Sequence, residues 1–339
     1  MPPKRSSIRA GRALALALAV VTLTGVPART AGPDCPKLDG DVVFVDTLWN
    51  ADLDETSGIQ ASQDHPGVMW VIEDSGNGPW MHAYSTDGRR LATYQLTGPD
   101  LRNVDWEAIG LDHRDGADLL YIGDVGDNRA TRDGVERPVP ALYRFPEPSV
   151  EPTQSPPLDA TVTGVEKFAF RYFDEQDRWK LNPSDAESLF VDPRTHNVFI
   201  VQKDLKRVDG TNKVARAFEL KDQDLAGGRL NHAVHVADPV GAGDGVGTGP
   251  VAGDIISDGR WIVMKNYQEG FLWPRAKGQT VAQALNATPV APCHVTVDGA
   301  EAITFGYSPD GVWTGFLSVR ESKKGNPPLH EVSRAFASA

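Results

Sequence analysis

A fivefold internal repeat is the feature of this sequence that most restricts its fold. Each copy has a small or acidic start, a short apolar segment, a turn rich in Asp, Pro and Gly, and a second segment rich in aromatic and β-branched residues. The copies begin at Ser57, Glu107, Glu187, Gly253 and Glu301. Because short apolar segments between such turns are typical of strands, the repeat predicts an all-β fold.

The arrangement of the copies predicts a closed ring of sheets. A third apolar segment follows in every copy, and a fourth follows in the first four copies, at 280–285 in the fourth. The fifth copy lacks this segment, whereas 41–46 precedes the first copy without a partner. We therefore predict a single five-bladed β-propeller in which the N-terminal strand completes the last blade and hides both edges. A sixth, degenerate blade between residues 107 and 187 is the alternative. The Pro-rich segment 135–157 is expected to be loop between blade strands, apart from the third strand of the second copy at 141–145.

The N-terminus has the composition of an export signal. Four cations precede the apolar run 13–26, which is too short to span a membrane. We predict that 1–28 is a signal peptide and that 36–339 forms the propeller of a secreted, monomeric protein. In an oxidising compartment, Cys35 and Cys293 are expected to form a disulfide, with two free thiols as the alternative.

The charge balance limits the partners of this chain. Lys and Arg number 34 and Asp and Glu number 46, which gives a formal net charge of −12. A nucleic-acid partner is disfavoured because it would require surplus cations. An anionic small molecule, bound through a metal ion and local cations, or an unidentified extracellular ligand is expected instead.

The acidic starts of the repeats predict a metal site. The innermost strand of each blade lines the central channel, so these side chains would face one another and repel. Calcium would remove this conflict and accepts six to eight oxygen ligands, whereas magnesium is stricter in geometry and zinc prefers His or Cys. The predicted ligands are Ser57, Glu107, Glu187, Asp254 and Glu301. In the fourth copy, the spacing to the turn favours Ala252 over Asp254 at the equivalent position.

A second ring of polar residues is expected at the ends of the second strands of the five copies. In each copy, this end lies beside the start of the first strand, because the two strands form a hairpin. Arg129, Lys203, Lys265 and Arg320 are predicted to bind an anion, and Asp124 or Asp127 to orient water. Two alternatives stay open. The acidic residues could form only a structural network with these cations, or they could hold calcium solely to stiffen the ring.

One blade resembles a known family. Asp105-Trp106-Glu107 and the segment 120–128 resemble a blade of the calcium-dependent apyrases, secreted five-bladed propellers that hydrolyse nucleoside di- and triphosphates. The resemblance implies that Ser57, Glu107, Glu187 and Glu301 bind a central calcium ion. The same residues also resemble exported actinobacterial propellers of unassigned function and, more distantly, phytase-type propellers.

The sequence therefore favours a secreted, calcium-binding propeller that hydrolyses phosphoric esters or anhydrides of nucleotides or other anionic molecules. The alternative is a non-enzymatic propeller that binds a glycan or a protein through its loops, because this fold does not determine function.

Overall fold

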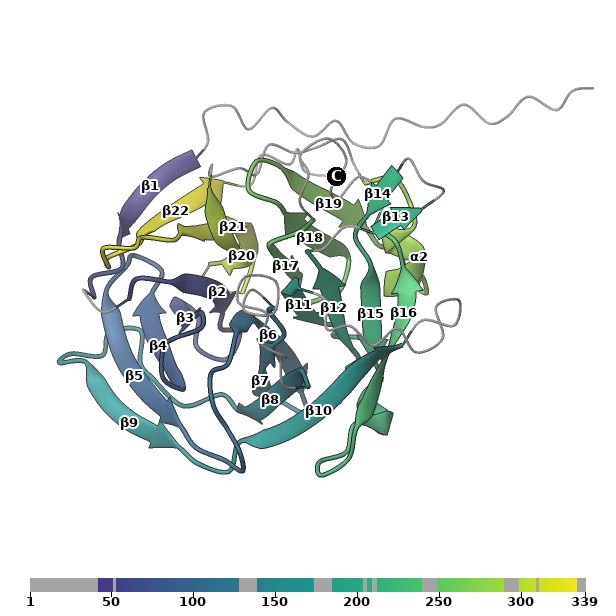
Figure 1. Ribbon diagram of the computed structural model, residues 1–339. Helices are drawn as coiled ribbons and strands as arrows, with labels where there is room; N and C mark the ends of the chain where they lie inside the picture. The colour runs from purple at the N-terminus through teal and green to yellow at the C-terminus, as the bar shows by residue number, and fades with distance from the viewer. Residues whose placement is uncertain are drawn as a thin grey trace, which may run out of the picture. The chain divides into compact units, whose positions relative to one another are not determined.

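The computed structural model describes residues 42–50, 53–127, 139–173, 185–203, 206–208, 212–239, 249–289, 299–308 and 311–333. All described elements belong to one compact unit, Pro33–Ala339. The predicted all-β class is confirmed, because nearly all of these elements are strands (Figure 1). The described part contains no helix with the length and apolar character needed to cross a membrane.

The first sheet follows the order of the sequence with one addition. Its strands are β2 (Thr56–Ala61), β3 (Val68–Glu73), β4 (Trp80–Ser85), β5 (Arg90–Leu96) and β9 (Leu158–Val162). The first four pair antiparallel, and β9 pairs parallel with β5. Strand β9, which directly follows the Pro-rich segment, was not predicted from the sequence.

A mixed eight-stranded sheet contains the second and third copies of the repeat. The second copy supplies β6 (Trp106–Arg114), β7 (Ala117–Asp124), β8 (Ala141–Pro146) and β10 (Glu166–Phe173). The third supplies β11 (Ala186–Val191), β12 (Val198–Gln202), β15 (Ala217–Leu220) and β16 (Asn231–Ala237). These two antiparallel groups are joined by parallel pairing of β10 and β16. The turn between β6 and β7 is an Asp-Gly pair with φ of 54° and 81°, as a tight hairpin requires.

The fourth copy forms a smaller, three-stranded sheet of β17 (Ala252–Ile255), β18 (Trp261–Lys265) and β19 (Gly270–Pro274). The prediction of a strand at 280–285 is wrong, because Val281–Leu285 is the helix α2. Thr280 caps this helix by accepting a hydrogen bond from the backbone of Gln283, whose side chain bonds the Thr280 backbone in return. This capping box and two alanines outweigh the single β-branched residue.

The last sheet joins the two ends of the described chain. It consists of β20 (Ala300–Tyr307), β21 (Trp313–Arg320), β22 (Pro328–Ser333) and β1 (Val42–Thr47). The predicted pairing of the N-terminal strand is confirmed, since β1 pairs antiparallel with β22. Two short elements lie outside these sheets: the β13 (Lys206–Val208) and β14 (Asn212–Val214) hairpin and the 3-10 helix η1 (Asp222–Asp224).

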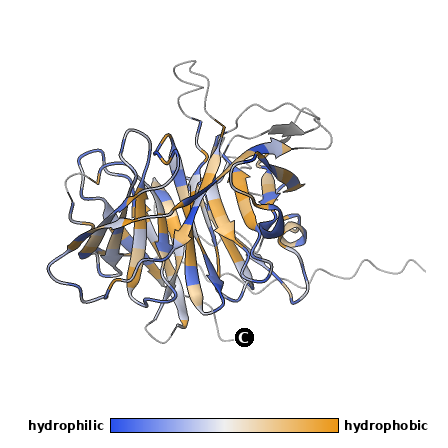
Figure 2. Ribbon diagram, turned by 90° about the horizontal axis from the view of Figure 1, so that it is seen from below, coloured by the Kyte–Doolittle hydropathy of each residue, from blue (hydrophilic) through white to orange (hydrophobic). Residues whose placement is uncertain are grey.

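The starting strands of the five groups contact one another in a cycle (Figure 1). β2 contacts β6 and β20, β6 contacts β11, β11 contacts β17, and β17 contacts β20. Apolar clusters fill the spaces between successive groups; for example, Trp70 and Tyr94 of the first sheet share a cluster with Trp106 and Tyr143. Figure 2 shows hydrophobic residues along the strands and hydrophilic residues in many of the connecting loops. These five starting strands, the inner strands of the fold, thereby surround a common centre.

Candidate metal centre

Four of the five inner strands begin with a β-bulge, and the extra residue of each bulge is a predicted ligand. In β2, Thr56 pairs with Glu73 and Gly58 with Ile72, which leaves Ser57 outside the ladder. The same register shift occurs between β6 and β7, between β11 and β12, and between β20 and β21. The residues without a partner in the ladder at those three shifts are Glu107, Glu187 and Glu301. Because a bulge re-aims side chains, it releases these groups from the alternation of the strand.

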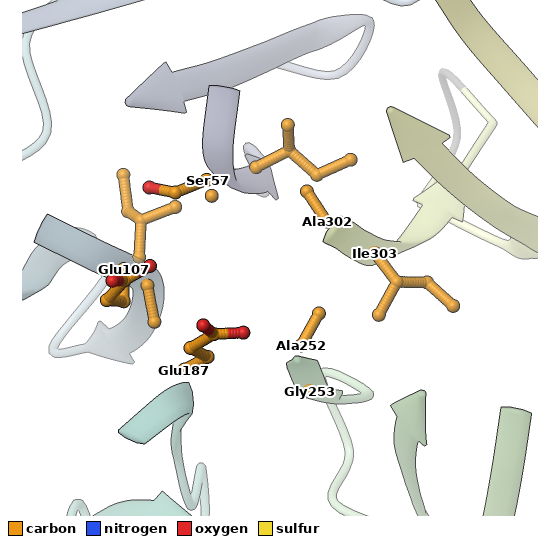
Figure 3. Close-up of a pocket in the computed structure, with 11 residues that line it drawn as sticks. Ser57, Glu107, Glu187, Ala252, Gly253, Ala302 and Ile303 are labelled. Carbon is orange, nitrogen blue, oxygen red and sulfur yellow. The ribbon is translucent and has the colours of Figure 1, made fainter. Parts of the chain in front are cut away.

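Three of these residues line a small central cavity (Figure 3). Ser57, Glu107 and Glu187 lie on one side of it, and Ala252, Ala302 and Ile303 lie on the other. All three polar residues are buried, and Ser57 Oγ donates a 2.7 Å hydrogen bond to the carbonyl oxygen of Trp106. The cavity is therefore acidic on one side and apolar on the other.

The fourth inner strand has no bulge at its start. Ala252 pairs with Lys265 and Gly253 with Met264 in an uninterrupted register, so Ala252 lines the cavity, as the turn spacing favoured. Asp254 does not line it. The Asp254 carboxylate accepts hydrogen bonds from Thr304 Oγ1 at 2.8 Å and from Phe305 N at 2.9 Å, and it joins β17 to β20.

More carboxylates lie around Glu107 and Glu187 than were predicted from the sequence. Oxygens of Asp74, Asp105 and Glu107 lie within 4.8 Å of one another, and so do oxygens of Glu107, Asp185 and Glu187. Glu107 belongs to both groups. Asp74, Asp105 and Asp185 were not predicted as ligands, although Asp105 and Asp185 each lie two residues before a predicted ligand, in Asp-Trp-Glu and Asp-Ala-Glu.

Burial and mutual repulsion make these carboxyl groups difficult to ionise. Burial, together with Glu187 and Asp74, raises the pKa of Glu107 well above its ordinary value of 4.5. The pKa of Glu187 is also raised well above 4.5 by burial, although Lys203 opposes the shift. Burial raises the pKa of Asp74 to about 7. A cation placed among these groups would favour their charged forms.

The backbone around Gly126 fits closely over the acidic groups. A Cβ atom at this position would collide with the Glu107 side chain and lie 2.8 Å from Asp105 Oδ2. The backbone N–H groups of Val125 and Gly126 both donate to the Asp105 carbonyl oxygen, at 3.2 Å. Only glycine lets this loop approach the carboxylates so closely. The possible metal ligands in these two groups are all carboxylate oxygens, which hard cations prefer.

Lys203 is the predicted anion-binding residue that lies at this site. Its Nζ donates to Glu187 Oε1, is 3.8 Å from Asp185 Oδ2 and lies 5.5 Å from the ring centre of Tyr267. Burial opposes its charge, but Glu187 and Asp185 outweigh burial and raise its pKa. Lys203 therefore stays protonated beside the acidic cluster.

Lys265 and Arg320, two further predicted anion-binding residues, do not line the central cavity. Lys265 is fully buried, and its Nζ donates to the carbonyl oxygens of Asn266 and Ala300. Arg320 is exposed at the end of β21. Arg129 lies outside the described residues, as do Cys35, Cys293 and the predicted signal peptide.

Asp124 and Asp127 support the metal-binding candidates through the backbone. Asp124 Oδ1 accepts a 3.1 Å hydrogen bond from Asp105 N, and Asp127 N donates at 2.9 Å to Asp185 Oδ1. Both aspartates are buried. These contacts hold the backbone of Asp105 and the carboxylate of Asp185 in place.

Glu301 lies beside the cavity but does not line it. Burial and the nearby Glu321 raise the pKa of Glu301, and Lys203 opposes them. Its bulge is present, yet Ala302 and Ile303 occupy the cavity wall. The candidate ligands are thus concentrated on β6 and β11 rather than distributed evenly around the ring.

A further group of possible ligands lies at the opposite end of the β6–β7 hairpin. His113 Nδ1 is 2.6 Å from Asp118 Oδ1 and 3.5 Å from Asp64 Oδ1. The hydrogen bond to Asp118 raises the pKa of His113. The ion pairs of His113 with Asp118 and Asp64 explain this group without a bound metal.

No protein-family model matches this chain, and no curated protein matches it in sequence. Among solved structures, the chain is similar to the major allergen Mala s 1 of Malassezia sympodialis, with a TM-score of 0.48 and 9% sequence identity. The match covers 88% of this chain and 98% of the allergen.

Proposed function

We propose that this chain is a five-bladed β-propeller whose axial carboxylates bind a calcium ion. The cyclic contacts of β2, β6, β11, β17 and β20 and the pairing of β1 with β22 support this architecture. In this interpretation, the eight-stranded sheet consists of two blades connected through β10 and β16, and β9 and α2 are additions to the first and fourth blades.

The observation that carries the proposed metal site is the position of Glu107. Its carboxylate lies within 4.8 Å of two further carboxylates in each of two groups, and the nearby cation Lys203 pairs with Glu187. Calcium fits this set better than magnesium, because crowded carboxylates from several loops provide many oxygens in an irregular geometry. Zinc fits less well, since neither group contains His or Cys.

For the activity, we propose hydrolysis of a phosphoric ester or anhydride at this site. A bound calcium ion would polarise a phosphoryl oxygen and acidify a water molecule. Lys203 would exchange part of its contact with Glu187 for a phosphate oxygen and hold the anion. Asp124 and Asp127 would keep Asp105 and Asp185 in position through the hydrogen bonds that they make.

Calorimetric titration of the mature protein with calcium chloride and magnesium chloride tests the metal site first. Calcium is expected to bind more tightly, and Glu107→Gln is expected to abolish binding. Glu151→Gln, which changes an exposed carboxylate, is the matched control. Equal binding to wild type and Glu107→Gln would contradict the assignment.

A hydrolysis screen tests the activity separately. Nucleoside triphosphates and inositol phosphates are incubated with the protein, with calcium or with chelator. Release of phosphate that requires calcium and Glu107 would support the proposed reaction. Calcium-dependent melting without release of phosphate would restrict the ion to a structural role.

We also propose that residues 1–28 direct export. N-terminal sequencing of protein recovered from the culture medium is expected to begin close to residue 29. An intact N-terminus inside the cell would contradict this.

A further inference from the structure

The first sheet has a second, larger cavity that the proposed metal site does not use. It has a volume of about 530 Å³, within the range of about 300–1,000 Å³ typical of small-ligand sites. Its lining includes polar residues from four strands and one partly exposed tryptophan, Trp80. It shares no lining residue with the central cavity.

The strand register brings the lining residues to one face of the sheet. On β4, Trp80 and His82 are two residues apart, so their side chains point to the same face. Thr93 of β5 lies opposite His82, and Asp159 of β9 lies beside Thr93. The added strand β9 thereby extends the wall of this cleft.

A bulge in β5 adds a positive charge to the same face. Ala83 pairs with Ala92 and Tyr84 with Arg90, so Leu91 is the extra residue. Without this bulge, Leu91 would lie opposite Tyr84 and Arg90 would point to the other face. Arg90 Nη2 instead lies 3.7 Å from Asp159 Oδ1, an ion-pair distance that leaves both side chains able to bond a ligand.

The floor of the cleft is held by a chain of three side chains. His82 Nδ1 lies 3.0 Å from Thr93 Oγ1, and His82 Nε2 lies 3.3 Å from Glu73 Oε2. Glu73 and His82 are both buried, and Glu73 Oε1 also accepts a hydrogen bond from Asp54 N. These contacts fix the polar groups of the floor before any ligand arrives, which lowers the entropic cost of binding.

Trp80 provides an apolar surface at the rim. It is 38% exposed, and its indole packs so closely against Gly78 that a Cβ atom there would collide with Nε1. An exposed indole beside convergent Asn, Arg, Asp and Thr side chains suits a ligand with an apolar face and a hydroxylated edge. A pyranose ring has both.

We propose that this cleft binds a neutral oligosaccharide, with one pyranose ring stacked on Trp80 and its hydroxyl groups bonded by Arg90, Asp159 and Asn77. The acidic side chains in the lining outnumber Arg90, which disfavours an anionic ligand. A single aromatic side chain also provides no cage for a quaternary amine. The inference is independent of the proposed hydrolase activity.

Titration of the mature protein with cellotetraose, maltotetraose, mannotetraose and chitotetraose tests this site, followed by intrinsic fluorescence and calorimetry. At least one is expected to bind at concentrations below about 10 mM, and Trp80→Ala is expected to weaken binding by about tenfold or more. Trp49→Ala is the matched control, because Trp49 is 65% exposed and does not line the cleft.

A second variant keeps the indole but displaces it. Gly78→Ala is expected to weaken binding as Trp80→Ala does, while the melting temperature stays close to that of wild type. Binding that persists in chelator and in Glu107→Gln would separate this site from the metal centre. Failure of all four saccharides to bind, unchanged binding in Trp80→Ala, or preferential binding of choline or inositol hexakisphosphate at this cleft would overturn the proposal.

Discussion

Glu107 and Glu187 each occupy the extra position of a β-bulge at the start of adjacent inner strands, and both carboxyl groups reach the same cavity. Oxygens of this pair lie within 4.8 Å of each other together with Asp185, in a buried environment that raises the pKa of both glutamates. Lys203 offsets the charge of Glu187, but a second charge on Glu107 beside it destabilises the fold unless a further cation is bound. The following predictions on the metal centre depend on this relationship.

Glu107→Gln should stabilise the metal-free protein at neutral pH. Because the amide removes one of the crowded acidic groups, we expect the free energy of unfolding in chelator to rise by about 1–3 kcal/mol. Calcium should then raise the melting temperature of wild type but not of this variant. Thermal melts with and without calcium provide the measurement, and a strong destabilisation in chelator would contradict the explanation.

The stability of the metal-free protein should fall as pH rises. A carboxyl group whose pKa is raised on folding stabilises the fold below its unfolded value, and this stabilisation is lost as pH rises through the folded value. For Asp74 that range extends from 3.8 to about 7. Melts in chelator should show the decline, and Asp74→Asn should reduce its slope. Asp100→Asn, which alters an exposed residue, should leave the slope unchanged.

Gly126→Ala should disrupt the metal centre. The added methyl group would collide with Glu107 and lie 2.8 Å from Asp105 Oδ2, so the loop must move away from both. We expect calcium affinity to fall at least about tenfold, or about 1.4 kcal/mol. Gly227→Ala is the control. A Cβ atom added at Gly227 would have the Lys167 carbonyl oxygen as its nearest neighbour, at an uncrowded 3.8 Å. Equal calcium affinity in both variants would show that the loop does not hold the site.

The inner strands and the pairing of β1 with β22 could be predicted because apolar segments and turns repeat regularly in the sequence. The helix α2 could not, since its capping box competes with a short apolar pattern that also fits a strand. The uneven distribution of carboxylates had a different cause. It depends on whether each strand has a bulge, and the absence of a bulge before Gly253 is shown only by the uninterrupted pairing of Ala252 with Lys265 and of Gly253 with Met264.

The second polar ring was predicted less well, for a reason that Lys265 illustrates. Its place at the end of a second strand matches that of Lys203, but its ammonium group is fully buried and bonds the Ala300 carbonyl oxygen. Sequence position placed both lysines near the axis, whereas the direction of each side chain depends on local packing. Long flexible side chains follow such packing more than they follow strand alternation.

The ion pair between Asp192 and Arg275 should be essential for stability. Arg275 Nη1 and Nη2 lie 2.6 Å and 2.9 Å from the two Asp192 oxygens, and both side chains are almost fully buried where the third and fourth groups of strands meet. Asp192→Ala would leave an unpaired buried cation, so we expect a loss of about 3–5 kcal/mol. The pair of Arg144 and Glu166 offers a comparison, because Glu166 is 56% exposed and Glu166→Ala should cost only about 0–1 kcal/mol. Urea denaturation of the two variants measures both values, and similar losses would mean that the buried pair does not hold these groups together.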